Sequence, residues 1–110
     1  MLNQQFQAAI DACNDCADAC DLCVASCLQE SDVGMMARCI SLDIDCAQIC
    51  RMTAGFLARQ SELLDILCET CAEICEACGD ECERHESQHC KDCADACRRC
   101  AEECRNLSGD

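Results

Sequence analysis

The stretch CETCAEICEACGDECERHESQHCKDCADACRRCAEEC, Cys68–Cys104, decides the fold. Its cysteines form two sets of five, and within each set they are alternately three and four residues apart. The same pattern occurs near the start of the chain, at Cys13–Cys27. Steps of three and four mark the a and d positions of a heptad, which line one face of a helix. The sequence therefore predicts helices whose core-facing seam, the line of a and d positions, consists of cysteine where leucine is usual.

The composition leaves little ordinary hydrophobic core. Of the 110 residues 51% are hydrophobic, but 18 residues are cysteine, and there are two phenylalanines and no tryptophan or tyrosine. A chain of this length with so few large apolar side chains is expected to need bound metal or oligomerisation for its stability.

The net charge of −14 argues against nucleic acid and against an anionic membrane surface as partners. No stretch approaches the roughly 20 apolar residues of a membrane span. Met1–Ile10 has neither a basic region nor an apolar run, so we expect no export signal. We therefore predict a cytoplasmic protein, with no nucleic-acid or membrane partner, whose thiols stay reduced.

Four helices are predicted, at about 4–29, 32–59, 62–84 and 87–107, and they make residues 1–110 a single domain. Ser31 or Asp32, Ser61 and Ser87 are suitable N-caps for the last three helices. Connections this short place neighbouring helices antiparallel. The predicted fold is all-α, an antiparallel up-down-up-down four-helix bundle with a cysteine-lined core. The seam of the second helix includes an acid, because it runs Met36, Cys39, Asp43, Cys46, Cys50, Thr53 and Leu57.

Antiparallel packing predicts two ends of different character. One end collects apolar residues: Phe6, Phe56, Leu57, Leu64 and Leu107. The other end collects sulfur and imidazole groups: Cys27, Met36, Cys39, Cys82, His85, His89 and Cys90. We hypothesise that metal is admitted at this second end, where thioether and imidazole groups pass it inward. The alternative is that His85 and His89 are merely polar loop residues.

Soft thiolates select copper(I), zinc or iron–sulfur clusters. Copper(I) accepts two sulfurs, which are then about 4.5 Å apart if the metal–sulfur bonds resemble those of zinc. Helix positions four apart can supply such pairs. One copper(I) per thiolate is also neutral, whereas a four-thiolate zinc site keeps a charge of about −2, which is expensive to bury in an acidic protein. The sequence thus favours many copper(I) ions per chain, roughly one per cysteine.

The candidate metal ligands are all the cysteines, with four further residues at the bundle end or in the seam. Asp43 is either a water-linked polar residue or an oxygen ligand. The complete set is Cys13, Cys16, Cys20, Cys23, Cys27, Cys39, Cys46, Cys50, Cys68, Cys71, Cys75, Cys78, Cys82, Cys90, Cys93, Cys97, Cys100, Cys104, Asp43, His89, His85 and Met36.

Other functions fit the sequence less well. A secreted disulfide scaffold would be rich in loops, but this chain has no proline and four glycines. Iron–sulfur ligands usually come from loops, often with a following proline. No nucleophile–base constellation or phosphate loop is visible, so we predict that the protein is not an enzyme. The remaining alternatives are a thiol-redox protein, which needs exposed cysteines of low pKa, and a metallochaperone for zinc or copper, which needs one exposed site.

Three strings together resemble one known family, the bacterial copper storage proteins, in their cytosolic branch: CNDCADACDLCVASC at Cys13–Cys27, CISLDIDCAQIC at Cys39–Cys50, and the Cys68–Cys104 stretch. The resemblance covers most of the chain. It implies a four-helix bundle filled with copper(I)–thiolate sites, which assembles as a homo-oligomer, a tetramer in the family's pattern. It also implies Asp43 and His89 as extra ligands. The function expected is high-capacity storage of copper(I), with copper donor and acceptor proteins that the sequence does not identify.

Overall fold

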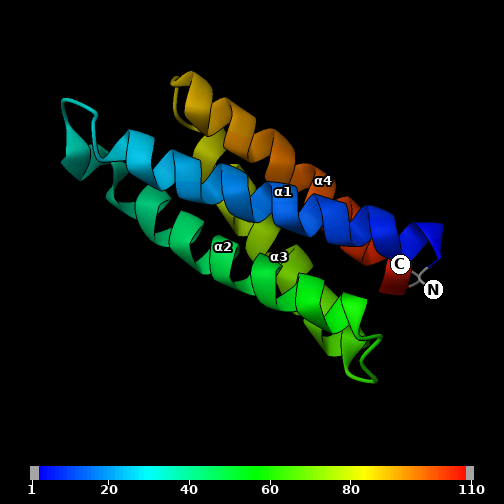
Figure 1. Cartoon of the computed structure of the whole chain (residues 1–110). Helices are drawn as coiled ribbons and strands as arrows, with labels where there is room; N and C mark the ends of the chain where they lie inside the picture. Colours follow the sequence, from blue (N-terminus) through cyan, green and yellow to red (C-terminus); the bar gives the residue numbers. More distant parts are fainter. Residues whose placement is uncertain (1–2, 109–110) are drawn as a thin grey trace.

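The computed structural model describes residues 3–108 and forms an elongated bundle of 46 × 21 × 19 Å. Its α-helices run nearly the full length of the bundle (Figure 1). A short 3₁₀ helix precedes the second of them. The elements are α1 (Gln4–Cys27), η1 (Val33–Met36), α2 (Ala37–Ala58), α3 (Leu64–Glu83) and α4 (Gln88–Ser108), with no strand between residues 3 and 108.

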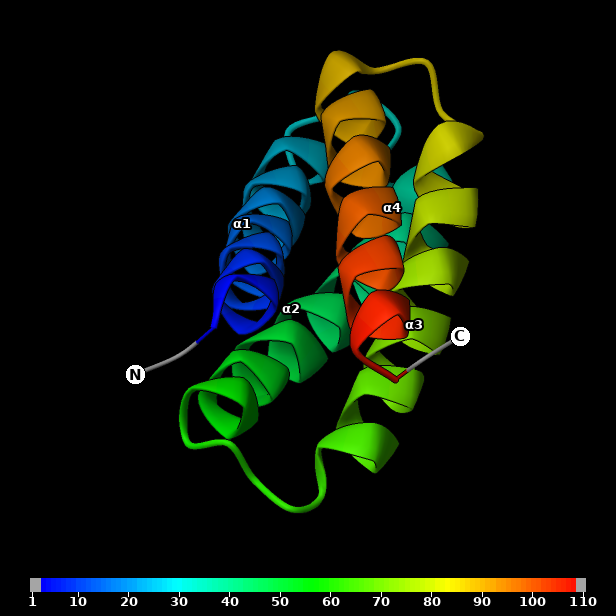
Figure 2. The ribbon, with the colours of Figure 1, turned by 90° about the vertical axis from the view of Figure 1, so that its right-hand side faces the viewer.

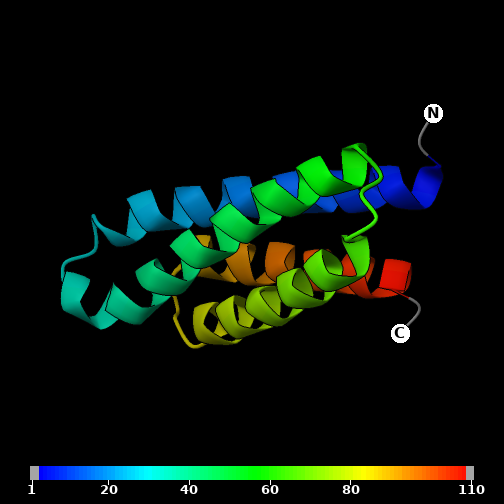
Figure 3. The same ribbon diagram turned by 90° about the horizontal axis from the view of Figure 1, so that it is seen from below.

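Consecutive helices are antiparallel. α1 packs against α2 and α4, and α3 packs against the same two helices (Figure 2). One end therefore holds the start of α1 and α3 and the finish of α2 and α4. At the other end the α1–α2 connection extends beyond the α3–α4 connection (Figure 3). The predicted all-α four-helix bundle with a cysteine core is confirmed.

The second helix starts later than predicted. Asp32 does act as a cap, since its Oδ1 accepts a hydrogen bond from the Met35 amide, but the helix it caps is η1. The α-helix proper begins at Ala37, five residues after the predicted start. The 3₁₀ turn leads directly into α2, and it places the side chain of Met36 against the core just before α2 begins.

Two predicted serine caps have other partners. Ser61 lies in the turn before α3, where its Oγ accepts from the Leu63 amide, and the helix starts at Leu64. The hydroxyl of Ser87, just before α4, donates to Glu30 across the bundle (2.9 Å). The sequence pattern placed these residues at helix starts correctly to within two or three residues. The side chain of Ser61 is engaged by a local contact, and that of Ser87 by a contact across the bundle.

The core consists of cysteine sulfur packed between alanines. All eighteen cysteines are at most 2% exposed. Alanines flank the seams and let the helices approach closely: Ala9, Ala12, Ala17, Ala47, Ala54, Ala72, Ala94 and Ala101 are all buried. The α2 seam is inward along its whole length, because Asp43, Thr53 and Leu57 are fully buried. Thr53 is satisfied locally, since its Oγ1 donates to the carbonyl of Ile49 (2.7 Å).

The apolar end forms largely as predicted. Leu57 is fully buried, and Phe6, Leu64 and Leu107 pack half-buried around the core there. Phe56 is half-buried too, and its ring lies 5.2 Å from the Arg59 guanidinium. We call this end, formed by these five apolar residues, the closed end.

The acids of α1 face solvent. Asp18 and Asp21 pair with Arg51 of α2, and Asp15 pairs with Arg99 of α4. Within residues 3–108, no helix is long and apolar enough to cross a bilayer.

Candidate metal centre

The cysteine sulfurs form one continuous column along the bundle axis. All eighteen cysteines are free thiols. Sulfurs from different helices approach within 3.6–3.9 Å of each other. Examples along the axis are Cys13–Cys100 (3.6 Å), Cys50–Cys75 (3.6 Å), Cys16–Cys46 (3.7 Å), Cys20–Cys93 (3.6 Å), Cys39–Cys82 (3.6 Å) and Cys23–Cys90 (3.9 Å). We call this set of eighteen buried thiols the sulfur column.

The predicted pairs four residues apart are close enough to share an ion. Their sulfur–sulfur distances are 3.8 Å for Cys23–Cys27, 3.9 Å for Cys46–Cys50 and 4.0 Å for Cys78–Cys82. These distances are shorter than the roughly 4.5 Å that two collinear metal–sulfur bonds span. A small rotamer change or a third sulfur would therefore complete the coordination of a soft ion.

Thiols also gather in fours, with each sulfur within 4.8 Å of the other three. Each of the groups named below draws its cysteines from three helices, so it exists only in the folded bundle. They include Cys13, Cys71, Cys100 and Cys104; Cys16, Cys46, Cys50 and Cys75; Cys16, Cys20, Cys46 and Cys97; Cys20, Cys78, Cys93 and Cys97; and Cys23, Cys27, Cys39 and Cys90. Because several cysteines belong to two groups, neighbouring sites share ligands.

Burial favours the protonated form of two outer thiols, those of Cys27 and Cys90. Removal from water raises the pKa of Cys27 to about 11, and it raises the pKa of Cys90 as well. A metal ion that binds here must replace these protons, so loading releases protons. None of the eighteen thiols has the exposure that a thiol-redox site requires.

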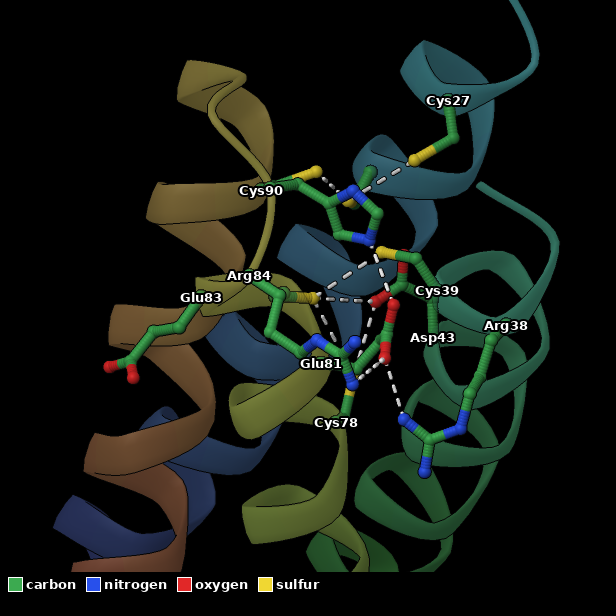
Figure 4. A network of polar contacts seen from close by, with 12 residues as sticks. Cys27, Arg38, Cys39, Asp43, Cys78, Glu81, Glu83, Arg84 and Cys90 are labelled. Carbon is green, nitrogen blue, oxygen red and sulfur yellow. Dashed lines mark hydrogen bonds and ion pairs between the residues drawn. The ribbon is translucent and has the colours of Figure 1, made fainter. Parts of the chain in front are cut away.

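Asp43 lies inside the sulfur column. It is fully buried, and it accepts hydrogen bonds from the thiols of Cys78 (3.1 Å), Cys93 (3.3 Å), Cys82 (3.5 Å) and Cys39 (3.7 Å). Figure 4 shows it beside Cys39 and Cys78. Burial, reinforced by the charge of Cys93, raises the pKa of Asp43 to about 8. Its contacts are with sulfur, which favours the oxygen-ligand interpretation over the water-linked one.

The mouth is the other end of the bundle, around Cys27, Met36, Cys39, Cys82 and Cys90. His89 reaches the sulfur column here. Its Nδ1 is 3.4 Å from the sulfur of Cys23 and 3.5 Å from that of Cys90. Its Nε2 faces Glu30 Oε1 at 3.2 Å. His89 is thus placed as a ligand would be, with one nitrogen toward the thiols and the other held by a carboxylate.

His85 is placed differently. Its Nε2 pairs with Glu81 Oε2 at 2.8 Å, and Glu81 Oε1 also accepts from Arg38 at 2.6 Å. Figure 4 shows Arg38 of α2 directed at Glu81 of α3. Burial alone would raise the pKa of Glu81, but His85 and Arg38 more than offset it and hold that pKa below its usual range. The structure therefore places His89 in direct contact with thiols, whereas His85 contacts Glu81 instead.

The two methionines of η1 differ in burial. Met36 is 5% exposed and belongs to the core, whereas Met35 is 69% exposed. Met36 therefore lies in the same buried cluster as the cysteines, and its role as a thioether ligand stays a prediction.

Sequence reasoning missed Glu30, Arg38 and Glu81. The Glu81–His85 pair could have been found, because residues four apart on a helix face each other. Glu30 lies fifty-nine positions from His89, and Arg38 lies forty-three from Glu81. No local pattern indicates pairs so far apart.

Comparison with known proteins identifies the family. Its sequence model, described as copper storage protein, matches residues 2–109. YhjQ, a cysteine-rich protein of Bacillus subtilis (strain 168), is 43% identical over 88 residues, which are 80% of this chain and 82% of YhjQ. The Cu(I)-bound copper storage protein BsCsp3 is 44% identical with a TM-score of 0.91, covering 96% of this chain and 99% of its own.

A cytosolic copper storage protein from Streptomyces lividans, solved with five coppers, gives a similar result. It is 38% identical to this chain with a TM-score of 0.94, and the match covers 97% of this chain and 94% of the Streptomyces protein. The spacing of the cysteines, their burial in one column and these similarities agree. The chain belongs to the copper storage protein family.

Proposed function

We propose that the protein stores copper(I) in the cytosol, at about one ion per core thiolate. The observation that supports this most is the sulfur column: eighteen buried free thiols with neighbours at 3.6–4.0 Å. Each ion replaces one thiol proton, so a copper(I)–thiolate unit is neutral. A core filled in this way buries no net charge, which is decisive in a chain of charge −14.

The geometry supports the following ligand roles. Each of the eighteen cysteines binds copper through its sulfur, since all are buried free thiols. Asp43 supplies an oxygen ligand within the column, and His89 supplies Nδ1 at the mouth. Met36 offers a thioether at the same end. His85 lies at the mouth as well, where it is held by its pair with Glu81. Copper is admitted at the mouth, because the closed end is packed with leucine and phenylalanine.

The other candidate functions lack a matching site. A metallochaperone needs an exposed pair of thiols for transfer, but every cysteine is buried. The family description names storage, which agrees with the prediction that the chain is not an enzyme. We propose cytosolic storage also because the Streptomyces lividans relative is described as cytosolic.

We also propose a homotetramer. Large apolar side chains remain exposed along the bundle surface: Leu22 (66%), Ile44 (43%), Met52 (53%) and Ile66 (64%). Burial of such side chains between copies would add stability that the thin core lacks. Native mass spectrometry of the metal-free and loaded protein gives the number of copies. A monomer in both states would contradict this assembly.

The deciding experiment is a copper(I) titration. The reduced, metal-free protein is titrated against a competing chelator, and the bound copper is counted by native mass spectrometry. Saturation near one ion per thiol with the helical circular dichroism retained is expected. Saturation at one or a few ions, or tighter retention of zinc than of copper(I), would instead indicate a chaperone or a zinc protein.

A further inference from the structure

A pocket opens on the α1–α4 side of the mouth. Its volume is about 410 Å³, and it is lined by Ala25, Ser26, Gln29, Glu30 and His89. His89 forms part of its wall and also touches the sulfurs of Cys23 and Cys90. The imidazole therefore connects the solvent-facing pocket to the outermost thiols of the sulfur column.

Glu30 is held in place at the edge of this pocket. It lies in the α1–α2 connection, where its amide donates to the carbonyl of Cys27 (3.1 Å). Its Oε1 accepts from the hydroxyl of Ser87 at 2.9 Å and faces His89 Nε2 at 3.2 Å. The side chain is 33% exposed, so it is tethered at its tip while one side meets solvent. These contacts join the end of α1 to the start of α4.

The tethered carboxylate determines how the imidazole is presented. A carboxylate accepts a hydrogen bond, so it favours the form of His89 that has its proton on Nε2. The lone pair of Nδ1 then faces Cys23 and Cys90. The same arrangement, in which a carboxylate orients a histidine through its distal nitrogen, supports metal-binding histidines generally.

We propose that Glu30 is a positioning residue for copper admission: it fixes His89 so that an ion reaching the α1–α4 pocket is first bound by Nδ1 and then passed to Cys23 and Cys90. This inference rests on the proposed storage function. In the transfer the copper–nitrogen bond breaks as a copper–sulfur bond forms, and the thiol proton leaves to solvent. Glu30 itself does not touch the ion.

His85 provides the internal contrast. It is also held by a carboxylate, Glu81, but that carboxylate is shared with Arg38 of α2 (2.6 Å). The Glu81 group therefore ties α2 to α3 on the opposite side of the mouth. The two histidines are four residues apart in sequence, yet we assign admission to the α1–α4 side alone.

The test measures the rate of the first loading phase by stopped flow, with copper(I) supplied as a complex with a competing chelator. Glu30→Ala is expected to slow this phase about tenfold, whereas Glu30→Gln, whose amide oxygen can still accept from Nε2, is expected to stay within about twofold of the natural protein. Glu102→Ala, which removes one exposed acid near the closed end, is the control for the change of charge. Its rate should be unchanged.

Two further readouts separate positioning from a general structural role. Nitrogen-15 NMR of the metal-free protein should show the Nε2–H form of His89 in the natural protein and in Glu30→Gln, and a mixture of the two forms in Glu30→Ala. In a His89→Ala background, Glu30→Ala should cause no additional slowing.

The assignment of Glu30 would be overturned if Glu30→Ala left the loading rate unchanged or left His89 in the Nε2–H form. It would also be overturned if Glu30→Ala slowed loading as much in the His89→Ala background as in the natural protein. The total copper bound at saturation is recorded for every variant. If the natural protein itself bound only a few ions, the storage function would fail, and that outcome is distinct from a failure of the Glu30 assignment.

Discussion

The two ends of the bundle differ in how they are held together. At the closed end a fully buried leucine, Leu57, and half-buried apolar side chains seal the core. At the mouth, ion pairs and imidazoles hold the helices: Glu30 with His89, and Glu81 with Arg38 and His85. Hydrophobic burial stabilises without binding soft metal, whereas imidazole and carboxylate groups can exchange partners with an incoming ion. The bundle thus separates stability and access along its axis.

The largest effect is expected at the closed end. Leu57→Ala should destabilise the reduced, metal-free protein by about 2–5 kcal/mol, because it leaves a cavity in a site with no exposed surface. Urea unfolding measures this change. Leu28→Ala removes the same atoms from a side chain that is 57% exposed, and it should cost less than about 0.5 kcal/mol. Equal costs for the two variants would mean that Leu57 does not seal the end.

A second prediction concerns Asp43, between the two ends. Its pKa is raised to about 8 in the folded protein from an ordinary value near 3.8. Between these values the folded state binds a proton that the unfolded state lacks, so folding stability falls as pH rises. From pH 5 to pH 7 the loss attributable to Asp43 should be about 2–3 kcal/mol.

The isosteric variant Asp43→Asn removes this titration. The difference in urea stability between the variant and the natural protein should therefore increase in favour of the variant as pH rises from 5 to 7. Both are measured without metal and with reducing agent. A difference that stays constant across this range would contradict a raised pKa for Asp43.

The third prediction tests the soft ligands of the mouth together. Met36→Leu combined with His85→Ala and His89→Ala should slow copper loading by about tenfold, since the thioether and both imidazoles of the mouth are lost, among them the imidazole of His89 that contacts the thiols. The amount bound at saturation should be almost unchanged, because the cysteines remain. Met52→Leu changes an exposed methionine (53%) outside the mouth and serves as the control. Natural loading kinetics in the triple variant would place admission elsewhere.

The smallest effect is expected for the ion pairs themselves. Arg38→Ala leaves Glu81, whose side chain is only 7% exposed, without one of its cations and should cost about 1 kcal/mol at pH 7. Arg51→Ala breaks two pairs between side chains that are all at least 49% exposed, and it should cost less than about 0.5 kcal/mol. Chemical denaturation of both variants gives the comparison. If Arg51 proved as costly as Arg38, burial at the mouth would not distinguish them.

The heptad pattern predicted the bundle and its core because a side chain at a seam position can face only the inside of the bundle. A cysteine at an a or d position of an antiparallel bundle must face inward, and all eighteen do. The same logic placed Asp43 and Leu57 in the core. Short connections then fixed which residues share an end.

The details of the mouth could not be predicted in the same way. The identity of the partner of each histidine depends on contacts between different helices and loops. Glu30 follows the end of α1 and approaches His89 from the α1–α2 connection, fifty-nine positions away in the sequence. Phe56 was predicted at the apolar end, but its contact with the guanidinium of Arg59, three residues later, was not predicted. Sequence periodicity determines which face of a helix is buried, whereas the pairing of side chains at the ends of the bundle depends on how the helices and connections meet there.

A sulfur column that is sealed at one end determines the order in which copper ions are bound and released. If ions cannot pass one another, the protein is a last-in, first-out stack. Copper acquired first would lie deepest, near Cys13 and Cys104, and would be withdrawn last. A cell that drew on this reserve would therefore spend its newest copper before its oldest, and a pulse of one copper isotope followed by another would leave in reverse order.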